Sequence, residues 1–242
     1  MRRSFGTHVG LVRRNNEDNH LGCELPDGRG MLLAVADGMG GYAAGEEASF
    51  LAIAALRAKW EELTGRTGLG EPFLVLLEGM RAANAAVYRA AVGDESRAGM
   101  GTTLTVAIME SRRVWVGHVG DSRLYLYRDD VLLPLTRDHS VVANLLLRGE
   151  ISEGETQTHP QRHLLTNALG LDIGLRADYA TLPVESGDIL LLCTDGLTNV
   201  VCPAEISQTI RESPFGETAG RLIKRSLAAG GHDNITVLVV EV

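Results

Sequence analysis

Hydrophobic residues in the first forty positions follow the patterns of β-strands. The segments Ser4–Leu11 and Asp18–Leu25 are typical of strands, and Gly30–Asp37 is an almost continuous apolar run. We expect this third run to be a buried strand that stops at Gly38. The chain therefore begins with three predicted strands.

Two longer segments then change to a helical period. We predict helices at about Gly45–Leu63 and Pro72–Val92, joined by the Gly/Thr-rich loop Thr64–Gly70. The residues expected on the buried faces are Phe50, Ile53, Ala54 and Trp60 in the first helix, and Leu76, Met80, Ala83 and Val87 in the second.

After Thr102 the pattern returns to short strands, and the pair Asp129-Asp130 marks a hairpin turn. The predicted strands are Thr103–Met109, Arg113–Val119, Ser122–Tyr127, Val131–Leu135, Asp178–Leu182, Asp188–Cys193 and Asn234–Val242. The predicted helices are Ser140–Arg148, Pro203–Glu212 and Glu217–Ala229. Strands and helix pairs follow one another in blocks without βαβ alternation, which predicts an α+β fold of mostly antiparallel sheets in one domain, residues 1–242.

Composition narrows the class of protein. Hydrophobic residues make up 45% of the 242 positions and charged residues 22%, as in ordinary globular proteins. The net charge of −8 disfavours nucleic-acid binding, which needs a basic surface. No apolar stretch reaches the roughly 18–20 residues of a membrane span. Cys23 and Cys193 lie in apolar runs and are expected to be buried free thiols, which suits the cytoplasm.

The most informative feature is that acidic residues fall at the ends of predicted strands. Asp37, Asp121 and Asp195 each follow an apolar strand, and Asp233 precedes the last one. Glu17 and Asp18 are adjacent where the second strand begins. A single Asp before Gly is usually a turn residue, but that explanation would have to apply four times here. We therefore expect these carboxylates to meet at one edge of the fold.

Carboxylates gathered in this way repel one another unless some are protonated or cations neutralise them. Oxygen ligands without His or Cys favour hard ions with octahedral coordination, Mg²⁺ or Mn²⁺. Two divalent ions would offset four of the eight net negative charges.

Seven ordered motifs resemble those of the metal-dependent serine/threonine protein phosphatases, often called protein phosphatase type 2C. They run from near Gly6 to the last strand, so the resemblance covers almost the whole chain. The matching segments are Arg13-Arg14-Asn15-Asn16-Glu17-Asp18, Val35-Ala36-Asp37-Gly38-Met39-Gly40-Gly41, Gly101-Thr102-Thr103, Gly120-Asp121-Ser122-Arg123, Asp138-His139-Ser140, Cys193-Thr194-Asp195-Gly196-Leu197 and Asp233-Asn234-Ile235-Thr236.

The resemblance implies a four-layer α-β-β-α sandwich with two Mn²⁺ or Mg²⁺ ions at one edge. It implies that Asp37 bridges both ions and that the carbonyl of Gly38 completes one coordination shell. Glu17 or Asp18, Asp195 and Asp233 are expected to supply the rest, partly through water. Arg13 resembles the arginine that grips the phosphate. Asp121 resembles the ligand of a third, weaker ion that Asp195 shares.

The implied activity is hydrolysis of phosphoserine and phosphothreonine in proteins by a metal-activated water, in signalling that reverses a Ser/Thr kinase. Animal members carry a histidine after the Asp-Gly, assigned as the general acid, whereas this chain has Met39, as bacterial members do. We expect a water on the third ion to replace that histidine. The polar stretch Gly149–His163 matches a flap near residues 143–166.

Two other functions stay open at this point. A catalytically dead binding module of the same fold would have lost ligands, whereas all the acids and Arg13 are present. A phosphohydrolase for small phosphoesters or nucleotides is disfavoured, because few aromatic or basic residues suggest a base-binding pocket. The expected partners are phosphoproteins and a cognate kinase, with no nucleic acid or membrane, and the protein is expected to be a monomer.

Overall fold

The computed structural model describes residues 1–25, 28, 30–40, 44–65 and 70–242. The strands are β1 (Arg3–His8), β2 (Asp18–Glu24), β3 (Gly30–Met39), β4 (Gly101–Thr102), β5 (Leu104–Glu110), β6 (Arg113–Val119), β7 (Arg123–Arg128), β8 (Val131–Pro134), β9 (Asp178–Pro183), β10 (Ile189–Cys193) and β11 (Ile235–Glu241). The helices are α1 (Ala44–Thr64), α2 (Pro72–Gly93), α3 (Val141–Leu147), α4 (Glu153–Thr156), α5 (Asp195–Thr198), α6 (Pro203–Glu212) and α7 (Thr218–Ala228).

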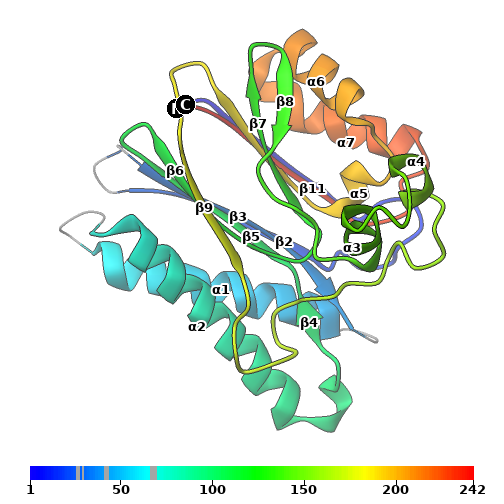
Figure 1. Cartoon of the computed structure of the whole chain (residues 1–242). Helices are drawn as coiled ribbons and strands as arrows, with labels where there is room; N and C mark the ends of the chain where they lie inside the picture. Colours follow the sequence, from blue (N-terminus) through cyan, green and yellow to red (C-terminus); the bar gives the residue numbers. More distant parts are fainter. Residues whose placement is uncertain (26–27, 29, 41–43, 66–69) are drawn as a thin grey trace.

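The strands form two antiparallel sheets that face each other. One has the order β1-β11-β10-β7-β8, and the other has the order β2-β3-β5-β6-β9, with β4 paired to β3. Helices α1 and α2 cover the outer face of the second sheet, while α6 and α7 cover the first (Figure 1). This is the four-layer α+β sandwich that the sequence predicted.

Three hydrophobic layers hold the sandwich together. One lies between the α1/α2 pair and its sheet and contains Leu76, Met80 and Trp60. The middle layer lies between the sheets, with Leu33 and Leu192 among its members. The third joins the first sheet to α6 and α7. Burial of these aliphatic side chains is the main favourable term in folding.

Most predicted elements are confirmed within a few residues, and the exceptions have physical reasons. Strand β3 continues through Gly38 to Met39, because β4 offers both residues a pairing partner. Strand β1 ends at His8, short of the predicted Leu11, and Gly10 adopts φ +83°. The hairpin at Asp129-Asp130 is confirmed, since both residues have positive φ.

The buried face of α1 differs from the prediction. Phe50 is 59% exposed and Ala54 is exposed as well, because Ala48, Ala52 and Leu56 face the sheet instead and let the helix approach closely. On α2 all four predicted core residues are fully buried. Short β4 and α5 were not expected, since two to four residues carry too little periodicity. The predicted loop Thr64–Gly70 lies partly outside the described residues.

The three cysteines are free thiols. Cys193 is buried as expected, but Cys23 is only half-buried because β2 is an edge strand. Within the described ranges, no helix is both long and apolar enough to cross a bilayer.

Two leucines on α2 test the first hydrophobic layer. Leu76 is fully buried and Leu74 is 52% exposed on the same helix. Leu76→Ala should lower the free energy of unfolding by about 2–5 kcal/mol, because it leaves a cavity. Leu74→Ala should change it by less than about 0.5 kcal/mol. Urea titrations of both variants check this, and equal effects would contradict the packing described above.

Candidate active site

Two carboxylates stand opposite each other at the centre of the site. Asp18 is the first residue of β2 and pairs directly with Asp37 of β3. Like charges facing each other across neighbouring strands destabilise a sheet. Asp18 Oδ2 accepts a hydrogen bond of 2.8 Å from the Thr194 hydroxyl, while its Oδ1 has no partner among the described residues. Burial raises the pKa of Asp18 to about 7.

Asp37 lies inside β3, two residues before its end at Met39, and its backbone is tightly held. Its N–H donates to Thr103 Oγ1 at 2.9 Å, and its carbonyl oxygen accepts from the hydroxyl of Thr102 at 2.8 Å. Burial, followed by the charges of Asp18, Asp195, Asp121 and Asp233, raises the pKa of Asp37 well above its ordinary value. Five sequence-distant carboxylates are therefore brought to one place.

Asp195 begins the short helix α5, with only Thr194 between it and the end of β10. Asn199, one turn later, donates to Asp195 Oδ2 at 2.9 Å, and Oδ1 is left without a partner in the described part of the chain. Burial and the charge of Asp233 raise the pKa of Asp195. The charge of His163, a residue of the predicted flap, lowers the pKa of Asp195.

Asp233 and Arg13 form an ion pair, with Arg13 Nη2 2.8 Å from Asp233 Oδ2. The chain bends on both sides of Arg13, at Val12 and at Arg14. Arg13 nevertheless points to the acidic edge, as the phosphate-binding prediction requires. Its side chain is half exposed, which leaves the guanidinium open to solvent.

Asn234 ties the N-terminal loop to this edge. Its Nδ2 donates to the carbonyl oxygens of Val9 and Asn15, and its Oδ1 accepts from the N–H of Glu17. Asn234 belongs to the last of the sequence motifs, which by itself predicts no role for this side chain. The signal in the sequence is the side-chain amide of Asn234 itself. It can donate and accept hydrogen bonds at once, and so it can join loops that hydrophobic periodicity does not describe.

Glu17 faces the start of α1, where space is very limited. A methyl group on Gly45 would meet the Glu17 carboxyl group, and one on Gly38 would overlap the carbonyl oxygen of Gly45. Burial raises the pKa of Glu17, although Arg13 opposes the shift. The backbone around Gly38 is therefore packed against α1 and Glu17 without free volume.

Asp121 follows β6 in a sharp turn. Gly120 before it has φ +108°, a conformation that favours glycine. Burial, with Asp195 next in importance, raises the pKa of Asp121. Asp121 and Asp195 line a cleft of about 470 Å³ whose walls come from α4, the following loop and the start of α6.

A chain of buried hydroxyl groups connects Asp37 with the Asp121 turn. The Thr103 hydroxyl, which accepts from Asp37 N–H, lies 2.8 Å from that of Ser122, directly after Asp121. Thr105 donates to the carbonyl oxygen of Ser122 at 3.0 Å and also contacts His118 Nδ1 at 2.9 Å. These bonds keep the two acidic segments in a fixed relation.

The donors fit hard cations. Asp18 Oδ1 and Asp195 Oδ1 are buried oxygens that lack a partner within the described residues, and such atoms are costly unless something binds them. No three His, Cys, Asp or Glu side chains of the described part converge closely enough to enclose an ion alone. Backbone carbonyls and waters would have to complete each shell, as Mg²⁺ and Mn²⁺ sites commonly allow.

Comparison with known proteins decides the family. Residues 8–229 match the model of the protein phosphatase 2C family. The chain belongs to that family.

The phosphatase is 40% identical over 242 residues to serine/threonine phosphatase stp of Listeria innocua, covering 100% of this chain and 96% of the relative. The crystal structure of the Mycobacterium tuberculosis serine/threonine phosphatase PstP/Ppp superposes with a TM-score of 0.90 at 38% identity, covering 100% and 98% of the two chains. The PstP catalytic domain in complex with two manganese ions gives a TM-score of 0.87 at 37% identity, covering 99% and 97%. The chain is a metal-dependent protein serine/threonine phosphatase.

Crowding of the acids predicts how the metal-free phosphatase responds to Asp37→Asn. The substitution removes one buried charge, so the chelated variant should melt higher than the chelated wild type, by roughly 2–4 °C per kcal/mol gained. Mn²⁺ at a hundredfold excess over its Kd should stabilise the wild type by about 2.7 kcal/mol and the variant much less. Thermal unfolding with EDTA and with Mn²⁺ measures both.

The same pKa shifts fix the sign of a pH effect on the chelated protein. The folded-state pKa of Asp18, about 7, exceeds the ordinary value of about 3.9, so the folded state holds this proton more strongly. The stabilisation that comes from this proton is fully present below about pH 4, and it is lost as the pH rises through about 7. A melting temperature that rises over this range in EDTA would contradict the crowding of acids.

Proposed function

We propose that the phosphatase holds two Mn²⁺ or Mg²⁺ ions at the edge where β2, β3, β10 and β11 meet. Asp37 would bridge them, with Asp195, Asp233 and either Glu17 or Asp18 around it and the carbonyl of Gly38 in one shell. The partnerless buried oxygens of Asp18 and Asp195 carry this proposal. The related PstP catalytic domain was crystallised with two manganese ions, which supports it.

Bound ions would supply an acidic water as the nucleophile, positive charge for the phosphate oxygens and, at a third position, a proton for the leaving group. The residues of the protein would serve mainly to position the ions and the substrate. The backbone of Asp37 is fixed through Thr102 and Thr103, which would hold its carboxylate in place at the edge. In-line attack on the phosphorus depends on such positioning.

Arg13 is the described residue best placed to bind the substrate phosphate. Its guanidinium pairs with Asp233 and is half exposed. On substrate binding it would donate two parallel hydrogen bonds to phosphate oxygens, a geometry that lysine does not reproduce. Charge on Glu17 and Asp37 also keeps the pKa of Arg13 raised, after the larger effect of its hydrogen bond to Asp233.

Asp121 and Asp195 would hold the third, weaker ion. Both line the cleft below α4 and α6, and each raises the pKa of its acidic neighbours. An ion held mainly by these two carboxylates would keep several waters and bind weakly. The segment near residues 143–166 would act as the flap over this cleft, because Glu153, Thr156 and Arg162 form one of its walls.

The proposed setting is intracellular signalling. Substrates would be phosphoproteins that a cognate Ser/Thr kinase has modified. The three free thiols suit a reducing compartment such as the cytoplasm. We further propose that the phosphatase acts as a single-domain monomer. Size-exclusion chromatography with light scattering tests the last point.

Chelation and Asp37→Asn test the two-ion proposal. EDTA should abolish hydrolysis of a phosphothreonine peptide, and Mn²⁺ or Mg²⁺ should restore it. Asp37→Asn should lower kcat by roughly three decades, because a bridging carboxylate has no substitute. Asp129→Asn, in the distant hairpin turn, is the matched control. Full activity in excess chelator would sink the proposal.

Two neighbouring arginines test phosphate binding. Arg13→Ala should raise KM for a phosphothreonine peptide by roughly tenfold or more, since a charge-assisted pair contributes about 1.5–3 kcal/mol. Arg14→Ala should leave KM nearly unchanged, because Arg14 is exposed at a bend. Steady-state kinetics on both variants make the comparison. The opposite result would move the assignment by one residue.

Asp121→Ala tests the third ion. The variant should keep its two tight ions and hydrolyse phosphoserine peptides more slowly, by roughly tenfold or more. It should retain more activity on p-nitrophenyl phosphate, whose leaving group needs little protonation. Metal content and both rates are measured on the same preparation. Equal losses on the two substrates would count against a proton supplied at this position.

A further inference from the structure

His139 holds both backbone polar groups of Gly120, the residue before Asp121. The N–H of His139 donates to the carbonyl oxygen of Gly120 at 2.7 Å, and His139 Nδ1 accepts from the N–H of Gly120 at 3.2 Å. Gly120 has the positive φ that turns the chain toward Asp121. A histidine outside the carboxylate cluster therefore holds the backbone of the residue that precedes Asp121.

The same residue joins the two ends of the segment proposed as the flap. Thr166 N–H donates to the carbonyl oxygen of His139 at 2.8 Å, and Asn167 Nδ2 lies 3.3 Å from His139 Nδ1. Next to it, Ser140 forms an isolated bridge with Leu165. The chain thus leaves for the flap and returns from it at His139.

Asp178 on the edge strand β9 sets the orientation of the ring. Because Nδ1 accepts from two N–H donors, Nε2 must carry the ring proton, and it donates to Asp178 Oδ2 at 3.2 Å. The Asp178 side chain is 62% exposed, whereas that of His139 is 12% exposed. A solvent-facing carboxylate therefore fixes a nearly buried imidazole.

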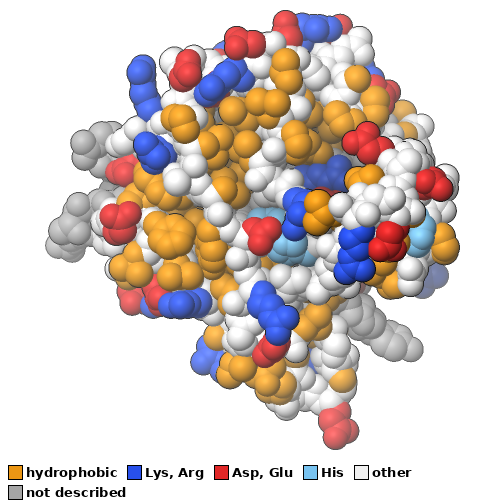
Figure 2. Space-filling view, viewed as in Figure 1, with side chains coloured by type: hydrophobic (Ala, Val, Ile, Leu, Met, Phe, Trp, Pro, Cys, Tyr) orange, Lys and Arg blue, Asp and Glu red, His pale blue; other side chains and the backbone are white. Residues whose placement is uncertain are grey.

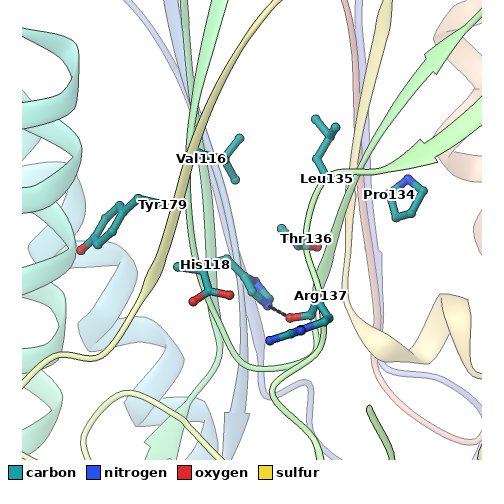
Figure 3. Close-up of a pocket in the computed structure, with 9 residues that line it drawn as sticks. Val116, His118, Pro134, Leu135, Thr136, Arg137 and Tyr179 are labelled. Atoms are coloured by element: carbon teal, nitrogen blue, oxygen red, sulfur yellow. Dashed lines mark hydrogen bonds between the residues drawn. The ribbon is translucent and has the colours of Figure 1, made fainter. Parts of the chain in front are cut away.

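A second histidine, His118, packs against the ring of His139. The rings of His118 and His139 are 4.8 Å apart, and His118 Nε2 donates to the carbonyl oxygen of Arg137 at 3.1 Å. Figure 3 shows this bond at the base of an open cleft between β6 and β9 on one side and the segment after β8 on the other. In Figure 2, hydrophobic side chains spread over much of this face, and histidine atoms (pale blue) lie near its centre.

We propose that His139 is a positioning residue that fixes the third-ion carboxylate Asp121 and the two ends of the flap together, with Asp178 as the partner that orients it. The proposal rests on the third-ion site proposed above. Among the described residues, the Asp178 side chain forms no hydrogen bond to a proposed metal ligand, and the bond it does form goes to the His139 ring.

Direct Mn²⁺ binding measures the effect without relying on turnover. Electron paramagnetic resonance of free Mn²⁺ gives both the number of tight ions and the affinity of the weak site. His139→Ala should keep two tight ions and weaken the weak site by about tenfold or more, as loss of a ligand-orienting partner commonly does. Asp178→Ala should act in the same direction. Asp178→Asn keeps a neutral acceptor for Nε2–H and should restore most of the affinity.

Amide exchange followed by NMR is a second, metal-independent readout. The amide protons of Gly120 and Thr166 should exchange faster in His139→Ala and Asp178→Ala, because both bond to His139 in the wild type. Thr181→Ala, an exposed change on the same strand, is the matched control and should leave the exchange and the Mn²⁺ affinity unchanged.

Asp121→Ala, measured in parallel, separates the two proposals. If it abolishes weak-site binding while His139→Ala stays within about twofold of the wild type, the positioning role is wrong and the third ion stands. If Asp121→Ala has no effect on weak binding, the third ion is wrong and the positioning role falls with it. Loss of the tight ions in His139→Ala would reduce the histidine to a general structural role.

Discussion

Repulsion between buried carboxylates is the constraint on which the rest of this structure depends. Asp18 faces Asp37 across two paired strands, and Asp195 approaches from the other sheet. Such an arrangement lowers the free energy of unfolding unless cations bind to it, so hydrogen bonds from the surrounding elements must hold the acidic residues in place. The hydroxyl of Thr194, which directly follows β10 of one sheet, donates to Asp18 of the other, so a hydrogen bond joins the two sheets beside the facing carboxylates.

The fold was largely predictable because hydrophobic periodicity records which face of an element is buried. Leu76 and Met80 illustrate this on α2. Phe50 was misplaced, because alanines carry little hydrophobic weight although they let α1 lie close to the sheet. Strand β3 ran past its predicted end for a related reason: pairing with β4 is a long-range event that no local pattern records.

The candidate site was predictable as a set of acids and much less as a mechanism. Acids beside apolar strands are visible in the sequence, and the structure does bring Asp18, Asp37, Asp121, Asp195 and Asp233 together. The supporting hydroxyls and amides were missed as contributors. Thr103, Ser122 and Asn234 carry no period and no charge, so their importance emerges only from their distances to partners.

The contact between Gly38 and Gly45 limits how this family member can change. Neither position has room for even one extra carbon, since α1, β3 and the Glu17 carboxyl group already touch. Substitutions at Gly38 or Gly45 are therefore unsuited to changing the width of the metal site. Adaptation to a different ion or substrate is open mainly on the opposite wall, where the α4 loop and α6 border solvent and tolerate variation. Among relatives, we therefore expect the residues around Gly38 and Gly45 to vary little and those of the α4 loop and α6 to vary widely.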